Sequence, residues 1–202
     1  MPQWILPPAS CEFLAEIARI LPAGSTGFEF GSGRSTHVLR HNLSGVTSVE
    51  DSRDWLEKTE TLPGHISRRP ADHPVVVPLT RCWNRLRLIQ SFHLEAHAAF
   101  LQHLKTARLI LVDSPPNPAK REHALYIALR HAPAGAIIVI DDLEVGATAR
   151  FAERLARQNA VAFRFWALNI DHRLGVFLKR DRSGRIRSCP SAREFIGTWL
   201  RA

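Results

Sequence analysis

The sequence contains few of the residues that build disulfide scaffolds or thiolate metal sites. Its three cysteines, Cys11, Cys82 and Cys189, lie far apart and form no Cys-x-x-Cys pair, which argues against both kinds of structure. No apolar run approaches the roughly 20 residues that a membrane-spanning helix needs. The N-terminus has neither the basic head nor the long apolar centre of a signal peptide,. We therefore expect a cytoplasmic protein with no membrane partner.

Lysine is also scarce, because only four of the 27 basic residues are lysine and the rest are arginine. The formal net charge is +8, and a basic surface can bind phosphates, nucleic acid or an anionic substrate. The sequence has no RNP-like aromatic motif, zinc finger or lysine-rich tail to support specific nucleic-acid binding. We expect a solvated, arginine-rich surface, and a small molecule is favoured over nucleic acid as the partner.

Hydrophobic periodicity predicts strands that alternate with helices within one domain over residues 1–202,. The expected strands are 27–30, 46–50, 75–79, 107–113, 136–142, 161–168 and 174–179. The expected helices are 10–21, 36–42, 53–62, 91–105, 119–131 and 147–158. Residues 80–89 fit neither pattern, 1–25 form an N-terminal helical segment, and 181–202 form a polar tail with a short helix at 192–200.

The order of these elements predicts an α/β fold. Near-continuous aliphatic runs at 107–113 and 136–140 suit parallel strands that are covered on both faces. Pro78 places the strand at 75–79 on a sheet edge. The five residues that join the last two strands are too few for a parallel crossover. We therefore expect a three-layer, Rossmann-like sheet of seven strands, mostly parallel, with an antiparallel last strand.

The stretch 26–36 joins the first predicted strand to a helix through Gly31-Ser32-Gly33. Glycine permits a sharp turn and lets the backbone approach a ligand closely, and a helix N-terminus offers free N–H groups. The next predicted strand ends at Glu50, where an acidic side chain can bind ribose hydroxyls. The pattern indicates either a nucleotide-type ligand or a turn with a purely structural role.

The sequence Glu29-Phe30-Gly31-Ser32-Gly33 resembles the E/D-x-G-x-G motif of class I S-adenosylmethionine-dependent methyltransferases. The strands at 109–113, 137–142 and 174–179 are similar to the fourth, fifth and last strands of that family. The resemblance implies that the glycine loop wraps the methionine part of S-adenosylmethionine, that the first acid holds its amino end, and that the acid after the second strand binds its ribose. The cofactor residues that it implies are Glu29, Gly31, Ser32, Gly33, Glu50 and Asp51.

The chain departs from the family pattern at two places. Ser35 stands where the third motif glycine is expected, and no acid follows the strand at 75–79, where the family often contacts the adenine amino group. Trp83 lies in that region and would stack on a base, or else be a tryptophan of the core or of the surface. The adenine contacts therefore stay open.

Three acids follow the fourth and fifth predicted parallel strands: Asp113, Asp141 and Asp142. The arrangement resembles the metal triad of catechol-type O-methyltransferases, and oxygen ligands suit Mg²⁺ or another divalent cation. The alternative is that Asp141 caps the next helix or braces a loop, with Asp142 exposed. Asp113 is the candidate catalytic residue in the acceptor site.

Three other patterns in the sequence do not match the motifs that they resemble, or give only weak support for a ligand site. The stretch 27–35 is one residue too long for a P-loop and carries Arg34 in place of the lysine, and Thr36 stands where a dinucleotide fingerprint needs glycine,. His93 and His97 would share one face of the helix at 91–105 as a solvated or packing pair rather than a zinc site. His37, just after the glycine loop, is a weaker candidate for contact with cofactor or acceptor.

The sequence thus predicts a methyltransferase that uses S-adenosylmethionine and acts on a hydroxyl of a small molecule. Two alternatives stay open. One is an NAD-dependent oxidoreductase, which Thr36 and the antiparallel last strand disfavour. The other is a catalytically inactive, methyltransferase-like module that binds nucleic acid or protein. A homodimer is compatible with the sequence.

Overall fold

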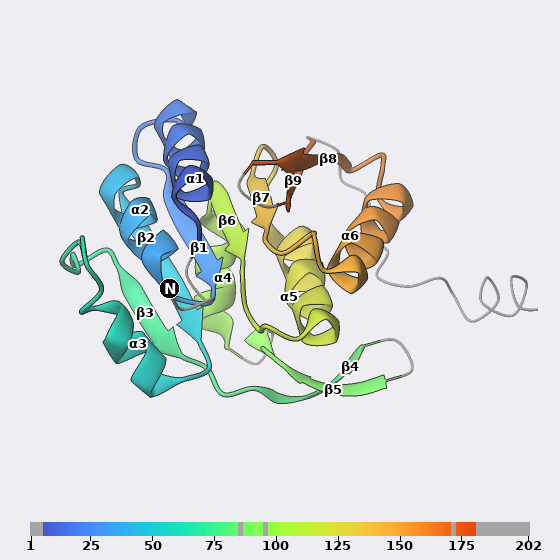
Figure 1. Ribbon diagram of the computed structural model, residues 1–202, viewed down its shortest axis with the longest axis horizontal. Helices are drawn as coiled ribbons and strands as arrows, with labels where there is room; N and C mark the ends of the chain where they lie inside the picture. Colours follow the sequence, from blue (N-terminus) through green and yellow to red (C-terminus); the bar gives the residue numbers. More distant parts are fainter. Residues whose placement is uncertain (1–5, 85–86, 95–96, 171–172, 181–202) are drawn as a thin grey trace, which may run out of the picture.

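The computed structural model describes residues 6–84, 87–94, 97–170 and 173–180, in which strands and helices alternate (Figure 1). The strands are β1 (Thr26–Phe30), β2 (Gly45–Glu50), β3 (His73–Val76), β4 (Thr80–Asn84), β5 (Arg87–Ser91), β6 (Leu109–Val112), β7 (Ile137–Ile140), β8 (Phe163–Asn169) and β9 (Arg173–Lys179). The helices are α1 (Pro8–Ile20), α2 (Arg34–Asn42), α3 (Arg53–Thr59), α4 (Ala98–Thr106), α5 (Pro118–His131) and α6 (Gly146–Gln158).

Seven strands form one sheet in the order β3-β2-β1-β6-β7-β9-β8. The pairs among β3, β2, β1, β6 and β7 are parallel, and β9 runs antiparallel to both β7 and β8. The sheet therefore confirms the predicted Rossmann-like fold, including the antiparallel last strand and the edge position of the third strand.

Helices cover both faces of this sheet (Figure 1). Side chains of α1 and α2 share one apolar cluster with Leu109, Leu111 and Val139. Side chains of α4, α5 and α6 share the other cluster with Phe28 and Phe30 of β1. Because side chains alternate across a strand, Glu29, between the two phenylalanines, faces the α1–α2 layer.

The predicted helix at 91–105 is wrong over its first half. Helix α4 begins only at Ala98, and Ser91 ends strand β5. Phe92 and His93 belong to no helix or strand, and Leu94 lies in a short 3-10 turn, in which its carbonyl accepts from the amide of His97 at 2.8 Å. Phe92 and Leu94 are buried, whereas His93 between them is exposed. His97 is the residue before the first turn of α4. The two imidazoles therefore do not share a helix face, and that prediction is also wrong.

Smaller differences concern element ends and a hairpin. The strands β4 and β5 form a separate two-stranded antiparallel sheet in the stretch that the sequence left unassigned. The hydroxyl of Ser91 donates to the carbonyl of Lys120 at 2.9 Å, which ties this hairpin to α5. The predicted strand at 75–79 lies at 73–76 instead, with Pro74 inside it, and an edge position tolerates that proline. The predicted helix at 192–200 lies outside the described residues.

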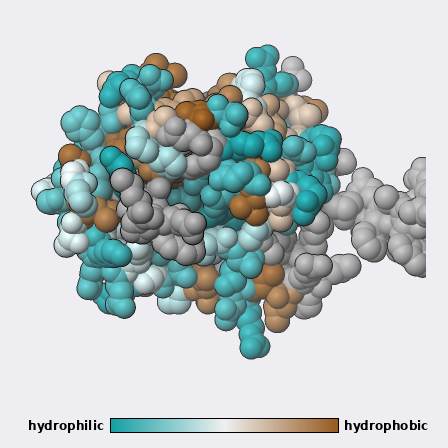
Figure 2. All heavy atoms as spheres, in the orientation of Figure 1, coloured by the Kyte–Doolittle hydropathy of each residue, from teal (hydrophilic) through white to brown (hydrophobic). Residues whose placement is uncertain are grey.

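Hydrophilic side chains cover much of the face shown in Figure 2, with hydrophobic ones in small groups among them. Within the described ranges, no helix combines the length and the apolar character that a membrane span requires.

Candidate functional site

A cavity of about 520 Å³ opens at the edge of the sheet where the parallel strands β1, β2, β6 and β7 end. Ligands of open α/β sheets bind at this edge, and the volume lies in the range of small-molecule sites. The residues that line it come from the chain before α1, the turn after β1, the end of β2 and the residues after it, α3, α5, and the loops after β6 and β7. They are Leu6, Pro7, Gly31, Ser32, Glu50, Asp51, Ser52, Trp55, Asp113, Ser114, Pro116, Arg121, Asp141, Asp142 and Glu144.

The turn after β1 needs glycine at its first position. Gly31 has φ +97°, and a Cβ atom added there would lie 2.8 Å from the Cβ atom of Ser114. A side chain would therefore strain the backbone and push the turn away from the loop after β6. Gly33 differs, since it has φ 169° and an added Cβ would meet open space.

We expect Gly31→Ala to destabilise the protein by about 2–5 kcal/mol, because left-handed strain of about 1–2 kcal/mol adds to overpacking of about 1–3 kcal/mol. Gly24→Ala is the matched control, since Gly24 has φ +81° and nothing lies within 4 Å of its added Cβ. Urea denaturation of both variants separates strain from contact. Equal losses of stability would show that the approach to Ser114 does not matter.

The backbone amides of the turn all donate within the protein. The amide of Gly31 donates to the carbonyl of Val49 at 2.8 Å, and the amide of Ser32 donates to Oε2 of Glu50 at 2.9 Å. The amide of Gly33 donates to the hydroxyl of Thr36 at 2.9 Å. A phosphate-binding loop directs such amides at its ligand, so this turn does not have the arrangement of a phosphate cradle.

Glu50 lines the cavity and also holds the turn in place. Besides the amide of Ser32, its Oε2 accepts from the hydroxyl of Ser32 at 3.1 Å. Its Oε1 accepts from the amides of Asp51 at 2.9 Å and Ser52 at 3.2 Å. Burial raises the pKa of this carboxyl, and the amide of Ser32 opposes that shift. Glu50 therefore fixes the end of β2 against the glycine turn.

Glu29 lies beneath the turn rather than in the cavity. It is completely buried, and it accepts from the hydroxyls of Ser48 at 2.6 Å and Ser35 at 3.1 Å. Burial raises its pKa to about 7, against hydrogen bonds from Ser48, Thr36 and Ser35 that lower it. Ser35, which replaces the third motif glycine, thus supports this carboxyl. Of the six cofactor residues that the sequence indicated, Gly31, Ser32, Glu50 and Asp51 line the cavity, whereas Glu29 and Gly33 support the turn.

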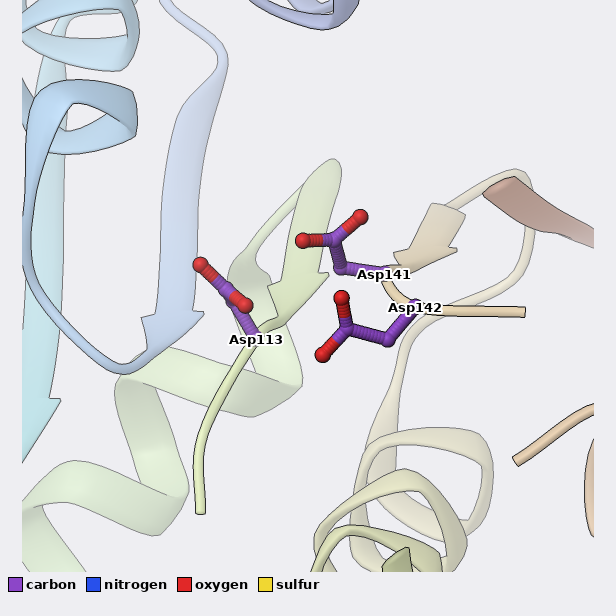
Figure 3. Close-up of side chains that lie close together, drawn as sticks. All are labelled: Asp113, Asp141 and Asp142. Atoms are coloured by element: carbon purple, nitrogen blue, oxygen red, sulfur yellow. The ribbon is translucent and has the colours of Figure 1, made fainter. Parts of the chain in front are cut away.

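Asp113, Asp141 and Asp142 converge at the ends of β6 and β7 (Figure 3). One carboxylate oxygen from each lies within 4.8 Å of the others. Burial raises the pKa of Asp113 well above its usual value, the charge of Asp141 raises it further, and Arg121 opposes the shift. The residue before the first turn of α6 is Val145, so the suggestion that Asp141 caps that helix is wrong. The three acids therefore lie close together, as the positions at the ends of the two predicted strands indicated.

Sequence reasoning missed Arg121, which lies under this cluster. Its side chain is 3% exposed, and it pairs with the carboxylate of Asp142. It also donates to three backbone carbonyls: Nη2 to Asp113 at 2.5 Å, Nε to Pro115 at 3.2 Å and Nη1 to Asp141 at 3.4 Å. An arginine within a helical segment carries no sequence signal for such a role, since arginine is common throughout this chain.

Trp55, in α3, is half-buried and lines the cavity, a position that the sequence did not indicate. Its indole N–H donates to the carbonyl of Ser32 at 2.6 Å. The ring therefore forms an aromatic part of the wall beside the glycine turn. Only the packing of α3 against that turn reveals this position.

His37 has a structural role instead of the suggested contact with a ligand. Its Nε2 lies 2.8 Å from the carbonyl of Thr59, and the amide of Ile66 donates to its Nδ1 at 3.0 Å. Since a carbonyl only accepts, Nε2 carries the proton. Burial lowers the pKa of this imidazole. His37 does not line the cavity.

Solved structures share this fold at low sequence identity. No protein-family model and no curated protein matches the sequence. A SAM-dependent O-methyltransferase from Thermotoga maritima has TM-score 0.57 and 12% identity, over 90% of this chain and 69% of its own. An rRNA methylase from Streptococcus thermophilus has TM-score 0.55 and 16% identity, over 85% of this chain and 95% of its own. A methyltransferase from Geobacter sulfurreducens has TM-score 0.54 and 14% identity, over 88% and 81%.

This chain therefore has the fold of the class I S-adenosylmethionine-dependent methyltransferases, as its motifs predicted. The structural similarity shows a shared fold in spite of these low identities, whereas activity depends on the residues of the site.

Proposed function

We propose that this chain transfers the methyl group of S-adenosylmethionine to a hydroxyl group of a small molecule. The observation that supports this best is the charge of the cavity beside the glycine turn. Its lining includes six acidic side chains, at positions 50, 51, 113, 141, 142 and 144, and one basic side chain, Arg121. S-adenosylmethionine carries its methyl group on a cationic sulfonium, together with a charged amino group and no phosphate.

The same lining disfavours the alternative of an NAD-dependent oxidoreductase. The two phosphates of NAD need donors or positive charge, but the amides of Gly31, Ser32 and Gly33 donate within the protein. Carboxylates would also repel the pyrophosphate group. A cationic ligand without phosphates fits this cavity better.

The residues of the cavity divide between the two partners of the reaction. The turn at Gly31 and Ser32 would lie against the methionine part of the cofactor, and Glu50 and Asp51 would receive the ribose hydroxyls. Trp55 offers a flat ring for the adenine base. Asp113 would hold the acceptor and take up its hydroxyl proton. Positioning of the two reactants can supply much of the rate enhancement.

Calorimetry with S-adenosylhomocysteine and with NAD tests the cofactor assignment. We expect saturable binding of S-adenosylhomocysteine and none of NAD. The reverse result would contradict the proposal. Transfer of a labelled methyl group to a panel of phenols, catechols, alcohols and amines tests the acceptor. Label on amines alone would refute the hydroxyl assignment and leave the cofactor assignment standing.

We expect Trp55→Ala to weaken binding of S-adenosylhomocysteine about tenfold, because base stacking on an aromatic ring contributes about 1–3 kcal/mol. Trp55→Phe keeps an aromatic ring but loses the donor to Ser32, so it separates stacking from support of the turn. Trp166→Ala is the control, since Trp166 is 42% exposed on β8. Calorimetry measures all three variants. Unchanged affinity in Trp55→Ala would remove this residue from the adenine site.

A further inference from the structure

We propose that the guanidinium of Arg121 takes the place that a divalent cation would have at the cluster of Asp113, Asp141 and Asp142. Arg121 would thus be a positioning residue that makes the site independent of metal. The resemblance to catechol-type enzymes implies a cation at these three acids. The contacts of Arg121 do not fit that cation.

The guanidinium already interacts with two of the three carboxylates. It pairs with Asp142, and its Nη2 lies 3.6 Å from Oδ1 of Asp113. A divalent cation held by the cluster would need oxygens of these same side chains at about 2.0–2.6 Å. The ion would then lie beside a guanidinium, which cannot lose its proton in a protein, and the two positive charges would repel each other.

Arg121 cannot move aside easily. Its side chain is buried, and its nitrogens also donate to the backbone carbonyls of Asp113, Pro115 and Asp141. These carbonyls belong to the loops after β6 and β7, the same loops that carry the acids. Moving Arg121 out would leave the carbonyls without these donors, and an unsatisfied buried polar group is costly.

The backbone of Asp142 is consistent with this pairing. Asp142 has φ 60°, a conformation that residues other than glycine seldom adopt and that marks functional or strained positions. In that conformation its carboxylate meets the guanidinium. Together, Arg121 and the loop backbone fix the carboxyl groups of Asp113 and Asp142 in the cavity. A fixed positive charge thereby opposes the repulsion among the three acids.

Titration of the metal-free protein with Mn²⁺, Mg²⁺ and Ca²⁺ by calorimetry tests this proposal without reference to activity. We expect no saturable binding by the wild-type chain at millimolar concentration. Arg121→Ala and Arg121→Gln should gain Mn²⁺ binding at least about tenfold tighter than wild type, and a second substitution, Asp142→Asn, should remove it. Arg121→Lys keeps a positive charge and should bind no ion. Arg164→Gln, at an exposed position of β8, should behave as wild type.

Two results would overturn the proposal. One is saturable Mn²⁺ binding by wild type that Asp142→Asn abolishes, a measurement that stands even if Arg121→Ala fails to fold. The other is the absence of a gain in folded Arg121→Ala or Arg121→Gln. A further measurement rests on the proposed function: methyl transfer should be insensitive to a chelator. Loss of transfer on chelation, without metal binding at the cluster, would show that a metal acts at another place and would contradict the metal-free role of Asp113 as base, while the pairing of Arg121 with the cluster would stand.

Discussion

Asp113→Asn should lower the rate of methyl transfer by about 100-fold or more, while the affinity for S-adenosylhomocysteine changes little. A positioned general base typically contributes about 10²–10⁴-fold. Asp113 ends the strand next to β1, lines the cavity, and is the acid whose pKa burial raises well above its usual value. Asparagine keeps the size of the side chain but cannot take up the proton of the acceptor.

Single-turnover transfer to an acceptor found in the labelled panel measures the rate, and calorimetry measures cofactor affinity. Glu57→Gln is the matched control, because Glu57 is an exposed acid on α3. A loss of affinity equal to the loss of rate would place Asp113 in the cofactor site instead. A full rate in Asp113→Asn would refute its role as base.

Glu50→Ala should weaken the binding of S-adenosylhomocysteine by more than about tenfold. Its carboxylate accepts four hydrogen bonds, from the amide and hydroxyl of Ser32 and from the amides of Asp51 and Ser52. Buried donors left without a partner cost about 1–3 kcal/mol each. The substitution would therefore remove a wall of the cavity and also loosen the glycine turn.

Two further variants separate these effects. Asp51→Asn changes an exposed side chain at the cavity, so a loss of affinity there without a loss of stability indicates direct contact with the ribose. Glu50→Gln keeps the volume but presents its amide group to backbone donors, so it should lose stability as well as affinity. Calorimetry and urea denaturation give both quantities. Unchanged affinity in Glu50→Ala would reject the ribose assignment.

The sheet could be predicted from the sequence because its central strands have a distinctive hydrophobic pattern. Residues 109–112 and 136–140 are aliphatic throughout, as is typical of parallel strands that are buried on both faces. The short link before β9 left no room for a crossover, so its direction followed from geometry. The residues after those strands, Asp113 and Asp141–Asp142, then had to meet at one edge.

The prediction was wrong or incomplete where tertiary contacts decide the outcome. The stretch from Ser91 was predicted to be helical, but Ser91 ends the hairpin strand β5 and α4 begins only at Ala98. Glu29 and Glu50 are both buried near the glycine turn, but only Glu50 lines the cavity, and the sequence could not distinguish these two positions. The role of Arg121 could not be predicted, because its contacts with three carbonyls and a carboxylate exist only where two loops and α5 meet in the folded chain.

The amides of the glycine turn have a thermodynamic consequence. Gly31, Ser32 and Gly33 are each held by an acceptor of the protein itself, so the turn is ordered before any ligand arrives. Binding therefore requires little loss of conformational entropy from this loop. Less of the energy of the contacts with the ligand is then spent on ordering the protein, so the affinity is higher. The free and occupied proteins should accordingly share one backbone conformation at the turn, with rigid docking rather than loop closure as the mode of entry.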